Sequence, residues 1–379
     1  MRITQLDVFE AQFPFRINFG HALASRSSSR SVFVRLESND GKVGFGECVP
    51  RDYVTGETPE SARIFIRDTL GPLFLGRSIE HFGQAPAFIT DTLSSVDEID
   101  LHGAAQCAVE LAVLDLFGGA FNSSVLTLLG PTVRNSIVYS GVLPFLPPPL
   151  MLLGALLHRM YGVTSIKLKV GRSLDEDLLN LRILRYALGP DADVRVDANC
   201  GWTPEQAISV IRAMSQFRVS TVEQPVPKDD FIGLKAVSDA VAIPVMADES
   251  LCTLDDARRL AEAHAVDMFN VRISKCGGLL AAREVAQVAQ QAGMFCQLGP
   301  HPGEGPLLTM AGRYFAATTP NLRYCEADIF DILRKQDYAA GRFRPGRGGR
   351  VRVRTSPGLG VQINEPNLTQ YIVARDRLS

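Results

Sequence analysis

The chain has 379 residues, of which 46% are hydrophobic and 21% are charged, and its 39 Lys and Arg residues nearly balance its 41 Asp and Glu residues. This composition excludes an intrinsically disordered chain, which needs low hydrophobicity and high net charge, and it argues against a nucleic-acid-binding protein, which usually has a basic excess. The length predicts two domains, or one large barrel with an attached domain.

The seven cysteines are odd in number, widely spaced and never in a Cys-x-x-Cys pair, which argues against a disulfide framework or a zinc ribbon. The N-terminal segment lacks the apolar core of a secretory signal. The longest apolar stretch, 145–157, contains three prolines and is shorter than the ~20 residues of a membrane span, so we interpret it as a loop that leads into a buried helix. We therefore expect a cytoplasmic protein that binds neither membranes nor nucleic acid.

Residues 1–125 predict an α+β capping domain. Polar and apolar residues alternate there as in half-buried antiparallel strands, with a turn at Asn39-Asp40-Gly41. The expected strands are 2–9, 31–36 and 44–48. The expected helices are 60–70 and 102–117.

Residues 126–326 alternate short β-branched runs with helical patterns, which is typical of βα units around a parallel sheet. Thr203, Pro204 and Gln206 form the best helix start, with an N-cap, a proline at the first position and a capping-box glutamine. The expected strands are 136–142, 165–170, 193–196, 221–222, 244–247, 268–271, 295–298 and 322–325. Eight such strands predict a TIM-type (β/α) barrel as the catalytic domain. We expect the C-terminal segment, 327–379, to pack back on the capping domain.

Charged and amide side chains follow the ends of successive barrel strands, where the active sites of such barrels lie. One charged group recurs every 25 to 28 residues from strand two to strand six. The residues in question are Lys167, Lys169, Asp197, Asn199, Glu223, Asp248, Glu249 and Lys275, followed by Glu304 in the seventh loop.

Three of these residues, Asp197, Glu223 and Asp248, are candidate metal ligands. Converging carboxylates repel one another unless a cation lies between them, and an all-oxygen set without His or Cys favours Mg²⁺ or Mn²⁺ over zinc. The alternative is that each carboxylate is only a helix N-cap. For a single residue the two interpretations weigh equally, but three carboxylates in phase with two lysine sites favour the metal.

The lysines are candidate acids and bases. Lys167 and Lys169 point to the same side of their strand because side chains alternate with a period of two. A lysine base needs a pKa lowered from ~10.4 toward ~7 to 8, and we expect Lys167 and a divalent ion to lower that of Lys169. Strands two and six lie across the barrel, so Lys275 should face Lys169. The alternative for each lysine is a surface salt bridge.

Together these segments resemble the enolase superfamily, and in particular the muconate-lactonizing subgroup of the mandelate racemase/muconate lactonizing enzyme family. The resemblance covers nearly the whole chain, and it includes the capping domain and the turn-rich tail. The motifs that carry it are Lys167-Leu168-Lys169, Asp197-Ala198-Asn199, Glu223-Gln224-Pro225, Asp248-Glu249-Ser250, 270–278 and 357–361.

The resemblance implies that a lysine removes the proton α to a carboxylate and that Mg²⁺ stabilises the resulting enediolate. It implies that Lys169 and Lys275 are the two acid/base groups and that Asn199 and Glu249 support the site. Glu304 resembles the family's seventh-strand glutamate, which hydrogen-bonds the substrate carboxylate. The family's barrels are often symmetric assemblies, so a homo-oligomer is expected.

Two segments depart from the family pattern. The seventh loop carries an additional histidine, His301, between two prolines. At the eighth strand, Glu326-Ala327-Asp328 is similar to the Asp-x-Asp pair with which dipeptide epimerases hold a substrate ammonium group, with Glu in the first position. We expect capping-domain loops around His21 and Tyr53 to contribute the remaining specificity.

The sequence thus predicts a Mg²⁺-dependent isomerase that acts on a small-molecule carboxylate, either a racemase or epimerase of an amino-acid derivative or dipeptide, or a muconate-type cycloisomerase. An acid dehydratase of the same superfamily is the main alternative, and a non-catalytic metabolite-binding barrel is a distant one. Six arginines between 342 and 354 could suggest an anionic partner, but we interpret Arg350, Arg352 and Arg354 as the exposed face of a strand.

Overall fold

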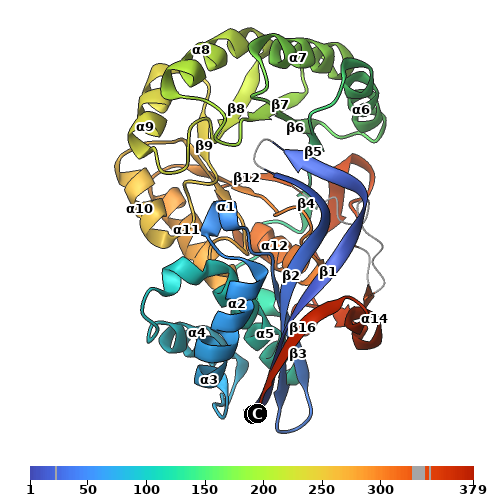
Figure 1. Cartoon of the computed structure of the whole chain (residues 1–379), viewed down its shortest axis with the longest axis vertical. Helices are drawn as coiled ribbons and strands as arrows, with labels where there is room; N and C mark the ends of the chain where they lie inside the picture. The colour runs from blue at the N-terminus through green and yellow to red at the C-terminus, as the bar shows by residue number, and fades with distance from the viewer. Residues whose placement is uncertain (22–23, 327–337, 341–342) are drawn as a thin grey trace.

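A curled parallel sheet ringed by helices and an antiparallel sheet with its own helices make up the protein (Figure 1). In the computed structural model, residues 1–21, 24–326, 338–340 and 343–379 are described, without side chains for 16–26. The two parts meet at the carboxyl end of the parallel sheet, where the functional side chains lie.

The parallel sheet has eight strands in the order β12-β11-β10-β9-β8-β7-β6-β5. A bridge between Ser140 and Glu326 connects its first and last strands, and the Ser140 amide donates to the Cys325 carbonyl at 2.8 Å. The strands are β5 (Gly141–Leu143), β6 (Ser165–Lys169), β7 (Asp193–Asp197), β8 (Val219–Glu223), β9 (Val245–Ala247), β10 (Met268–Val271), β11 (Phe295–Leu298) and β12 (Leu322–Cys325). The predicted fold class is confirmed.

Helices follow the strands and cover the outside of the sheet (Figure 1). They are α6 (Pro148–Met160), α7 (Leu174–Leu188), α8 (Pro204–Met214), α9 (Phe231–Ala240), α10 (Leu254–Glu262), α11 (Leu279–Gln291) and α12 (Pro306–Thr318). The expected capping box starts α8, because the Gln206 amide donates to Thr203 Oγ1 at 3.3 Å and the Thr203 amide donates to Gln206 Oε1 at 3.0 Å.

The capping sheet has the order β16-β1-β2-β3. Its last-numbered strand comes from the C-terminus and pairs antiparallel with β1, so both ends of the chain lie in one sheet. The strands are β1 (Ile3–His21), β2 (Ala24–Ser38), β3 (Val43–Cys48) and β16 (Ile372–Leu378). The helices are α1 (Asp52–Thr55), α2 (Pro59–Phe65), α3 (Gly71–Phe74), α4 (Ala85–Leu93) and α5 (Gly103–Ala120).

The remaining elements are short. They are η1 (Ile66–Leu70), η2 (Phe82–Gln84), η3 (Ile99–His102), η4 (Val125–Leu128), η5 (Ser215–Phe217), η6 (Arg347–Gly349), β4 (Ser136–Val138), β13 (Ala339–Ala340), β14 (Arg350–Arg352), β15 (Gln362–Ile363) and α14 (Glu365–Thr369). On β14, Arg350 and Arg352 are exposed, as is Arg354 just beyond it. The predicted domain boundaries at 125 and 326 stay predictions.

Helix α5 connects the capping sheet to the barrel. By length and composition, Ile99–Ala120 could cross a membrane, but 78% of its apolar window is buried within the protein. Its Glu110 accepts hydrogen bonds from the amides of Leu279 and Leu280 at 2.5 and 3.1 Å, at the start of α11. A Cβ at Gly278 would lie 2.6 Å from the Glu110 side chain, so this close contact requires glycine.

Four predicted elements differ in detail from the structure. The strand expected at 136–142 is two strands, because β4 turns away to pair antiparallel with β14 while β5 joins the barrel. The helix expected at 60–70 is α-helical only to Phe65 and continues as a π-helix over Ile66–Leu70. The strands expected at 2–9 and 31–36 are each much longer, because pairing between β1 and β2 continues beyond the alternating pattern.

The helix expected to be buried after the apolar stretch 145–157 is instead a surface helix. On α6 only Met151 and Ala155 are buried, while several large apolar side chains face outward. These are Leu150, Leu153, Leu156, Leu157 and Met160. Helix α6 packs on α7 along a narrow stripe, and the three prolines mark its start rather than a core position.

Candidate functional site

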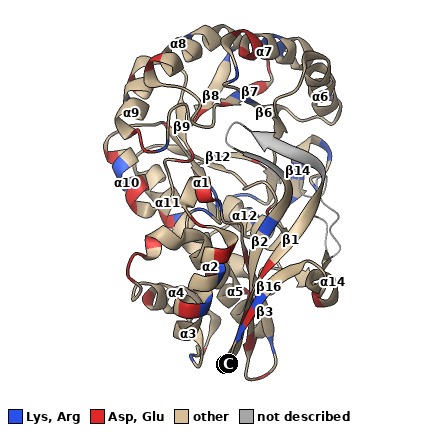
Figure 2. Ribbon diagram, viewed as in Figure 1, with Lys and Arg blue, Asp and Glu red and all other residues tan. Residues whose placement is uncertain are grey.

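The predicted charged residues lie together at the carboxyl end of the barrel strands. Lys169, Asp197 and Glu223 end β6, β7 and β8, and the parallel register pairs Lys169 with Asp197 and Asp197 with Glu223. Asp248 directly follows β9, and Lys275 follows β10 by four residues. All five side chains are buried. Most other charged residues lie instead on the outer helices and loops (Figure 2).

The two lysines of β6 share Asp197 and differ in their other partners. Lys169 Nζ donates to Asp197 Oδ2 and to Asn199 Oδ1, both at 2.6 Å. Lys167 Nζ lies 3.3 Å from Asp197 Oδ2, 3.1 Å from Glu223 Oε2 and 2.7 Å from Glu326 Oε2. Lys167 is thus surrounded by three carboxylates, whereas Lys169 lies closer to the mouth of the barrel.

Lys275 enters from the other side, because β10 lies four strands from β6 in the sheet. Its Nζ donates to Asp248 Oδ1 at 2.9 Å, to the Asp248 carbonyl at 2.6 Å and to the Asn270 carbonyl at 3.0 Å. Although burial alone would lower the pKa of Lys275, the Asp248 carboxylate holds it above its usual value. Lys169 and Lys275 therefore come from strands four apart in the sheet, and that they face one substrate stays a prediction.

Sequence reasoning missed Arg272, which lies within the motif 270–278 but was not assigned a role. Its Nε donates to Asp248 Oδ1 at 2.9 Å, its Nη2 also binds Asp248, and its Nη1 donates to the Pro300 carbonyl at 3.0 Å. A cation directly after β10, three residues before Lys275, was the available signal. Arg272 holds Asp248 and the seventh loop in place.

Arg195 was also missed. It is a fully buried guanidinium inside the barrel, two residues before Asp197 on the same face of β7. It lies 3.2 Å from Glu326 Oε1, donates to Ser140 Oγ at 2.6 Å and stacks over the Tyr324 ring at 4.3 Å. An arginine at an inward position of an apolar strand was the available signal.

The electrostatics of the carboxylates differ. Burial raises the pKa of Glu223 to about 8, and the neighbouring Asp197 adds to this effect. Burial would also raise the pKa of Asp197, but the adjacent Lys169 and Lys167 lower it to about 2. The Glu223 carboxylate is surrounded by donors, since Asn270 Nδ2 and Gln297 Nε2 reach it at 2.8 and 3.1 Å. Glu223 therefore holds a proton more tightly than Asp197 does.

Asp197, Glu223 and Asp248 have the oxygen chemistry that a hard divalent ion needs. In the described part of the chain, no three His, Cys, Asp or Glu side chains form a preformed metal cluster. Each of the three carboxylates instead binds a lysine or an arginine side chain. Two nearby buried oxygens, Glu249 Oε2 and Asn270 Oδ1, have no hydrogen-bond partner among the described residues. Buried oxygens in excess of donors fit an additional cation at this site.

Asn199 and Glu249 form one chain of contacts behind Lys169. Asn199 Nδ2 donates to Glu249 Oε1 at 3.1 Å while its Oδ1 accepts from Lys169. The backbone amide of Asn199 also donates to Asp197 Oδ1 at 3.0 Å. Asn199 thus orients both the lysine and the carboxylate that binds it.

Glu304 and His301 lie together in the seventh loop. Both are buried, and the His301 amide donates to Glu304 Oε1 at 2.7 Å. His301 Nδ1 lies 3.2 Å from the Val49 carbonyl of the capping domain, while Nε2 has no partner within the described residues. Burial holds the pKa of His301 well below its usual value, so the ring is neutral. The unexplained histidine of this loop therefore contacts the capping domain.

The capping-domain residues are placed only in part. Tyr53 lies half-buried in α1, and the neighbouring Val54 carbonyl accepts from Lys228 Nζ of the fourth barrel loop at 3.0 Å. This contact brings the Tyr53 loop to the mouth of the barrel. The backbone of β1 ends at His21, whose side chain lies outside the described set, as does the whole of Asp328.

Glu326 is not available to a substrate ammonium group in this structure. Its two carboxylate oxygens bind Lys167 and Arg195, and the side chain is 5% exposed. The similarity to an Asp-x-Asp ammonium site therefore does not extend to its first residue, because two buried cations already neutralise this carboxylate.

Comparison with known proteins places this geometry in a family. Residues 3–130 match the model of the mandelate racemase/muconate lactonizing enzyme N-terminal domain, and 153–367 match the enolase C-terminal domain-like model. The chain is 28% identical over 386 residues to the N-succinyl-L-Arg/Lys racemase of Bacillus cereus, covering 99% of each chain. The crystal structure of that racemase matches with a TM-score of 0.91, at 27% identity and over 100% of both chains.

Two further relatives extend the comparison. A dipeptide epimerase from Cytophaga hutchinsonii, complexed with Mg and the dipeptide D-Ala-L-Val, matches with a TM-score of 0.88, at 26% identity and over 100% of both chains. A chloromuconate cycloisomerase from a Pseudomonas species is 28% identical over 385 residues, covering 98% of this chain and 99% of the relative. These relatives are all isomerases by name, which confirms the predicted enzyme class. The chain belongs to the mandelate racemase/muconate lactonizing enzyme family of the enolase superfamily.

Proposed function

We propose that the protein is a Mg²⁺-dependent racemase or epimerase that inverts the carbon α to the carboxylate of an N-acylated amino acid or a dipeptide. The observation that carries this proposal is the pair of buried lysines, Lys169 and Lys275, on strands four apart in the sheet. Inversion needs one group to remove a proton from one face and another to return a proton to the opposite face.

The side chains support separate roles for the lysines. Lys169 binds Asp197 and Asn199, so its ammonium group is oriented by two oxygens and can exchange its proton with a substrate above them. Lys275 is held by Asp248 and two carbonyl oxygens, which favour its protonated form and suit it to return a proton. Lys167, bound to three carboxylates, would stay charged. It would contribute a fixed positive charge to the site and would not transfer the substrate proton.

Asp197, Glu223 and Asp248 would hold the metal. When bound, Mg²⁺ would supply positive charge where the substrate carboxylate gains charge as its α-proton leaves. The similarity to an epimerase complexed with Mg supports this assignment. The all-oxygen carboxylate set supports it independently.

Proton exchange in D₂O tests the proposal. N-acyl-L-amino acids and dipeptides should acquire deuterium at the α-carbon and appear as both stereoisomers. In Lys169→Ala, one enantiomer of the substrate should still exchange while the other does not, and Lys275→Ala should show the opposite preference. Loss of water from a sugar acid, with no such exchange, would indicate the dehydratase instead.

A muconate-type cycloisomerase is the second candidate, favoured by the similarity to chloromuconate cycloisomerase. That reaction needs proton transfer from one side only. The cycloisomerase would be selected over the racemase if the protein converts muconate and if only one of the variants Lys275→Ala and Lys169→Ala loses that activity.

A further inference from the structure

The surface helix α6 is apolar on every side. Its only charged or polar side chains are those of His158 and Arg159, both in the last turn. A helix that is apolar all round is normally buried, because a surface helix needs only one apolar stripe to face the core. On α6, however, only Met151 and Ala155 are buried. The packing of the chain therefore does not explain the apolar residues of its outer face.

The exposed apolar residues of α6 form one stripe, called here the α6 stripe. They follow one another at the spacing i, i+3, i+7 and i+10, which places them on a single face of the helix. The same spacing is typical of helices that pack against another helix. The stripe consists of Leu150, Leu153, Leu157 and Met160, whose exposed fractions lie between 46% and 72%.

Helix α7 lies beside α6 and leaves the stripe open (Figure 1). The Arg159 side chain points to α7, since its Nη1 donates to the Ala187 carbonyl at 2.7 Å. Met160, the next residue on α6, is the most exposed member of the stripe. The contact with α7 is thus made beside the stripe and does not cover it.

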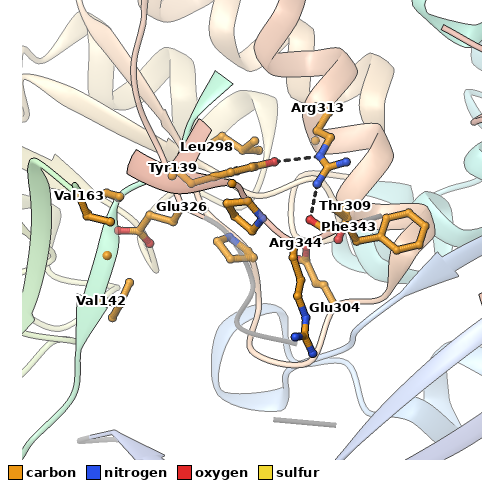
Figure 3. A pocket seen from close by; sticks show the side chains of 18 of the residues that line it. Tyr139, Val142, Val163, Leu298, Glu304, Thr309, Arg313, Glu326, Phe343 and Arg344 are labelled. Carbon is orange, nitrogen blue, oxygen red and sulfur yellow. Dashed lines mark hydrogen bonds between the residues drawn. The ribbon is translucent and has the colours of Figure 1, made fainter. Parts of the chain in front are cut away.

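A cavity of about 670 Å³ also borders α6, and of the stripe it takes in only Leu157. Arg313 of α12 lies in the wall of this cavity and is 4% exposed. Figure 3 shows its guanidinium bound to Tyr139 and to the main chain of Phe343. The other three members of the α6 stripe do not line the cavity and remain open to solvent.

The stripe is large enough for a stable contact between two proteins. With the neighbouring Leu156 and Tyr161, which are also exposed, it presents on the order of 600 Å² of surface, at the upper end of the ~300 to 600 Å² of the largest apolar patch on a typical monomer. Each partner contributes ~800 Å² to a standard interface, including a polar rim. The stripe can therefore form the apolar centre of such an interface.

The charges beside the stripe have opposite signs at its two ends. Helices α6 and α7 both lead from the carboxyl end of one barrel strand to the start of the next, so they run in the same direction. Near their beginning, Asp175 and Glu176 are exposed in the first turn of α7. Toward their ends, Arg159 and Arg182 are exposed. Within the part of the chain that the structure describes, none of these four residues forms an ion pair.

A second copy of the chain matches this distribution. A two-fold axis perpendicular to α6 would place the two α6 helices antiparallel, with one stripe against the other. The acidic end of each copy would then face the basic end of its partner, whereas a parallel arrangement would bring like charges together. A helix that lies on a membrane instead has a basic polar face, and here acids flank the stripe as well.

We propose that the α6 stripe is the interface through which two copies of this chain associate, with their α6 helices antiparallel across a two-fold axis. The stripe forms the apolar centre of the interface, and Glu176 of each copy faces Arg182 of the other at its rim. The proposal concerns a surface outside the barrel mouth and does not depend on the reaction that takes place there.

Size-exclusion chromatography with light scattering tests the interface. The unchanged protein should form dimers, or assemblies of dimers, at micromolar concentration. Leu153→Glu should reduce the mass by a factor of two or more, because association would bury two like charges close to the axis. Ile232→Glu is the matched control, since Ile232 is an exposed apolar residue on α9, and it should leave the mass unchanged. A monomeric unchanged protein, or equal masses for the two variants, would overturn the proposal.

Met160→Lys covers the case in which Leu153→Glu does not fold. Met160 is 72% exposed, so a lysine at this position can extend into solvent in the separated copy. Circular dichroism should show an unchanged helix content, and the mass should fall as for Leu153→Glu. A folded Met160→Lys variant that keeps the mass of the unchanged protein would contradict the assignment.

Charge reversal tests the antiparallel arrangement. Arg182→Glu should raise the Kd of the dimer by about fivefold or more, because the two-fold axis repeats the repulsion with Glu176. Adding Glu176→Arg to the same chain should restore the affinity, since each reversed charge again meets its opposite in the partner. A double variant as weak as Arg182→Glu would overturn this arrangement. Binding of monomeric unchanged protein to phosphatidylglycerol vesicles would assign the stripe to a membrane and overturn the whole proposal.

Discussion

The capping sheet and the barrel mouth both contain buried carboxylates bound by cations, but the cations differ in their exposure. In the capping sheet, Asp7 is fully buried, while its partners Arg375 and Arg377 are 39% and 56% exposed. In the barrel, Asp248 and its partner Lys275 are both almost fully buried. Water therefore solvates Arg375 and Arg377, while a third cation near Asp7, Arg35 at 3.9 Å, is 14% exposed. This network holds β1 and β16 together. The second network removes both signs of charge from water, which is the arrangement that changes proton affinities.

The largest expected effect is on catalysis, from Asp248→Asn in the barrel. The variant removes the charge that binds Lys275 and Arg272, so α-proton exchange should fall by about a hundredfold or more. The rate of deuterium incorporation measures it. Asp239→Asn is the matched control, since Asp239 pairs with Lys235 at 2.6 Å on an exposed face of α9. Equal rates in the two variants would show that the barrel network is only structural.

Glu110 couples the two regions and predicts a pH effect. Burial raises its pKa to about 8, so the folded state holds a proton that the unfolded state releases near pH 4.5. Stability is therefore lost as pH rises from about 4.5 to about 8, by up to about 1.4 kcal/mol per pH unit. Glu110→Gln, which still accepts from Leu279 and Leu280, should show a flatter dependence.

Urea unfolding at pH 5, 6, 7 and 8 checks this prediction. The exposed Glu262→Gln serves as the control and should keep the slope of the unchanged protein. Parallel curves for Glu110→Gln and the unchanged protein would show that Glu110 ionises normally.

Mg²⁺ should stabilise the barrel network and not the capping network. Binding to the folded state alone adds about 2.7 kcal/mol at a hundredfold excess over the Kd, which should raise the melting temperature by a few degrees. Thermal unfolding with EDTA and with Mg²⁺ measures the shift. Glu223→Gln should abolish the rise in melting temperature with Mg²⁺, and Asp7→Asn should retain it. A rise that persists in Glu223→Gln would rule out Glu223 as a metal ligand.

The smallest expected effect is on stability, from Asp7→Asn in the capping sheet. Loss of this carboxylate leaves Arg375 and Arg377 without their shared partner, at a cost of about 1 to 3 kcal/mol. Urea unfolding measures the loss, and α-proton exchange per folded molecule should be unchanged. A variant that folds normally but loses activity would mean that the capping network also acts on the reaction.

Much of the site could be predicted because strand-end residues recur once per βα unit. Lys169, Asp197 and Glu223 end their strands as expected, and Asp248 and Lys275 follow closely. Arg195 and Arg272 were missed, since a single positive charge inside an apolar run gives no sign of its partner. The split at 136–142 was missed because one continuous β pattern served two sheets.

The alternation of strand and helix patterns predicted the barrel, and the spacing of charged residues predicted the order of its functional groups, because a parallel sheet brings the ends of its strands to one edge. The motifs around those residues carried the resemblance to the family. The sequence could not determine which cation each carboxylate binds, that Glu326 is neutralised by Lys167 and Arg195, or that Arg313 is buried beside a cavity without a carboxylate partner among the described residues. Those features depend on side chains far apart in the chain, and ion pairs and burial arise only where packing brings such side chains within a few ångströms of each other.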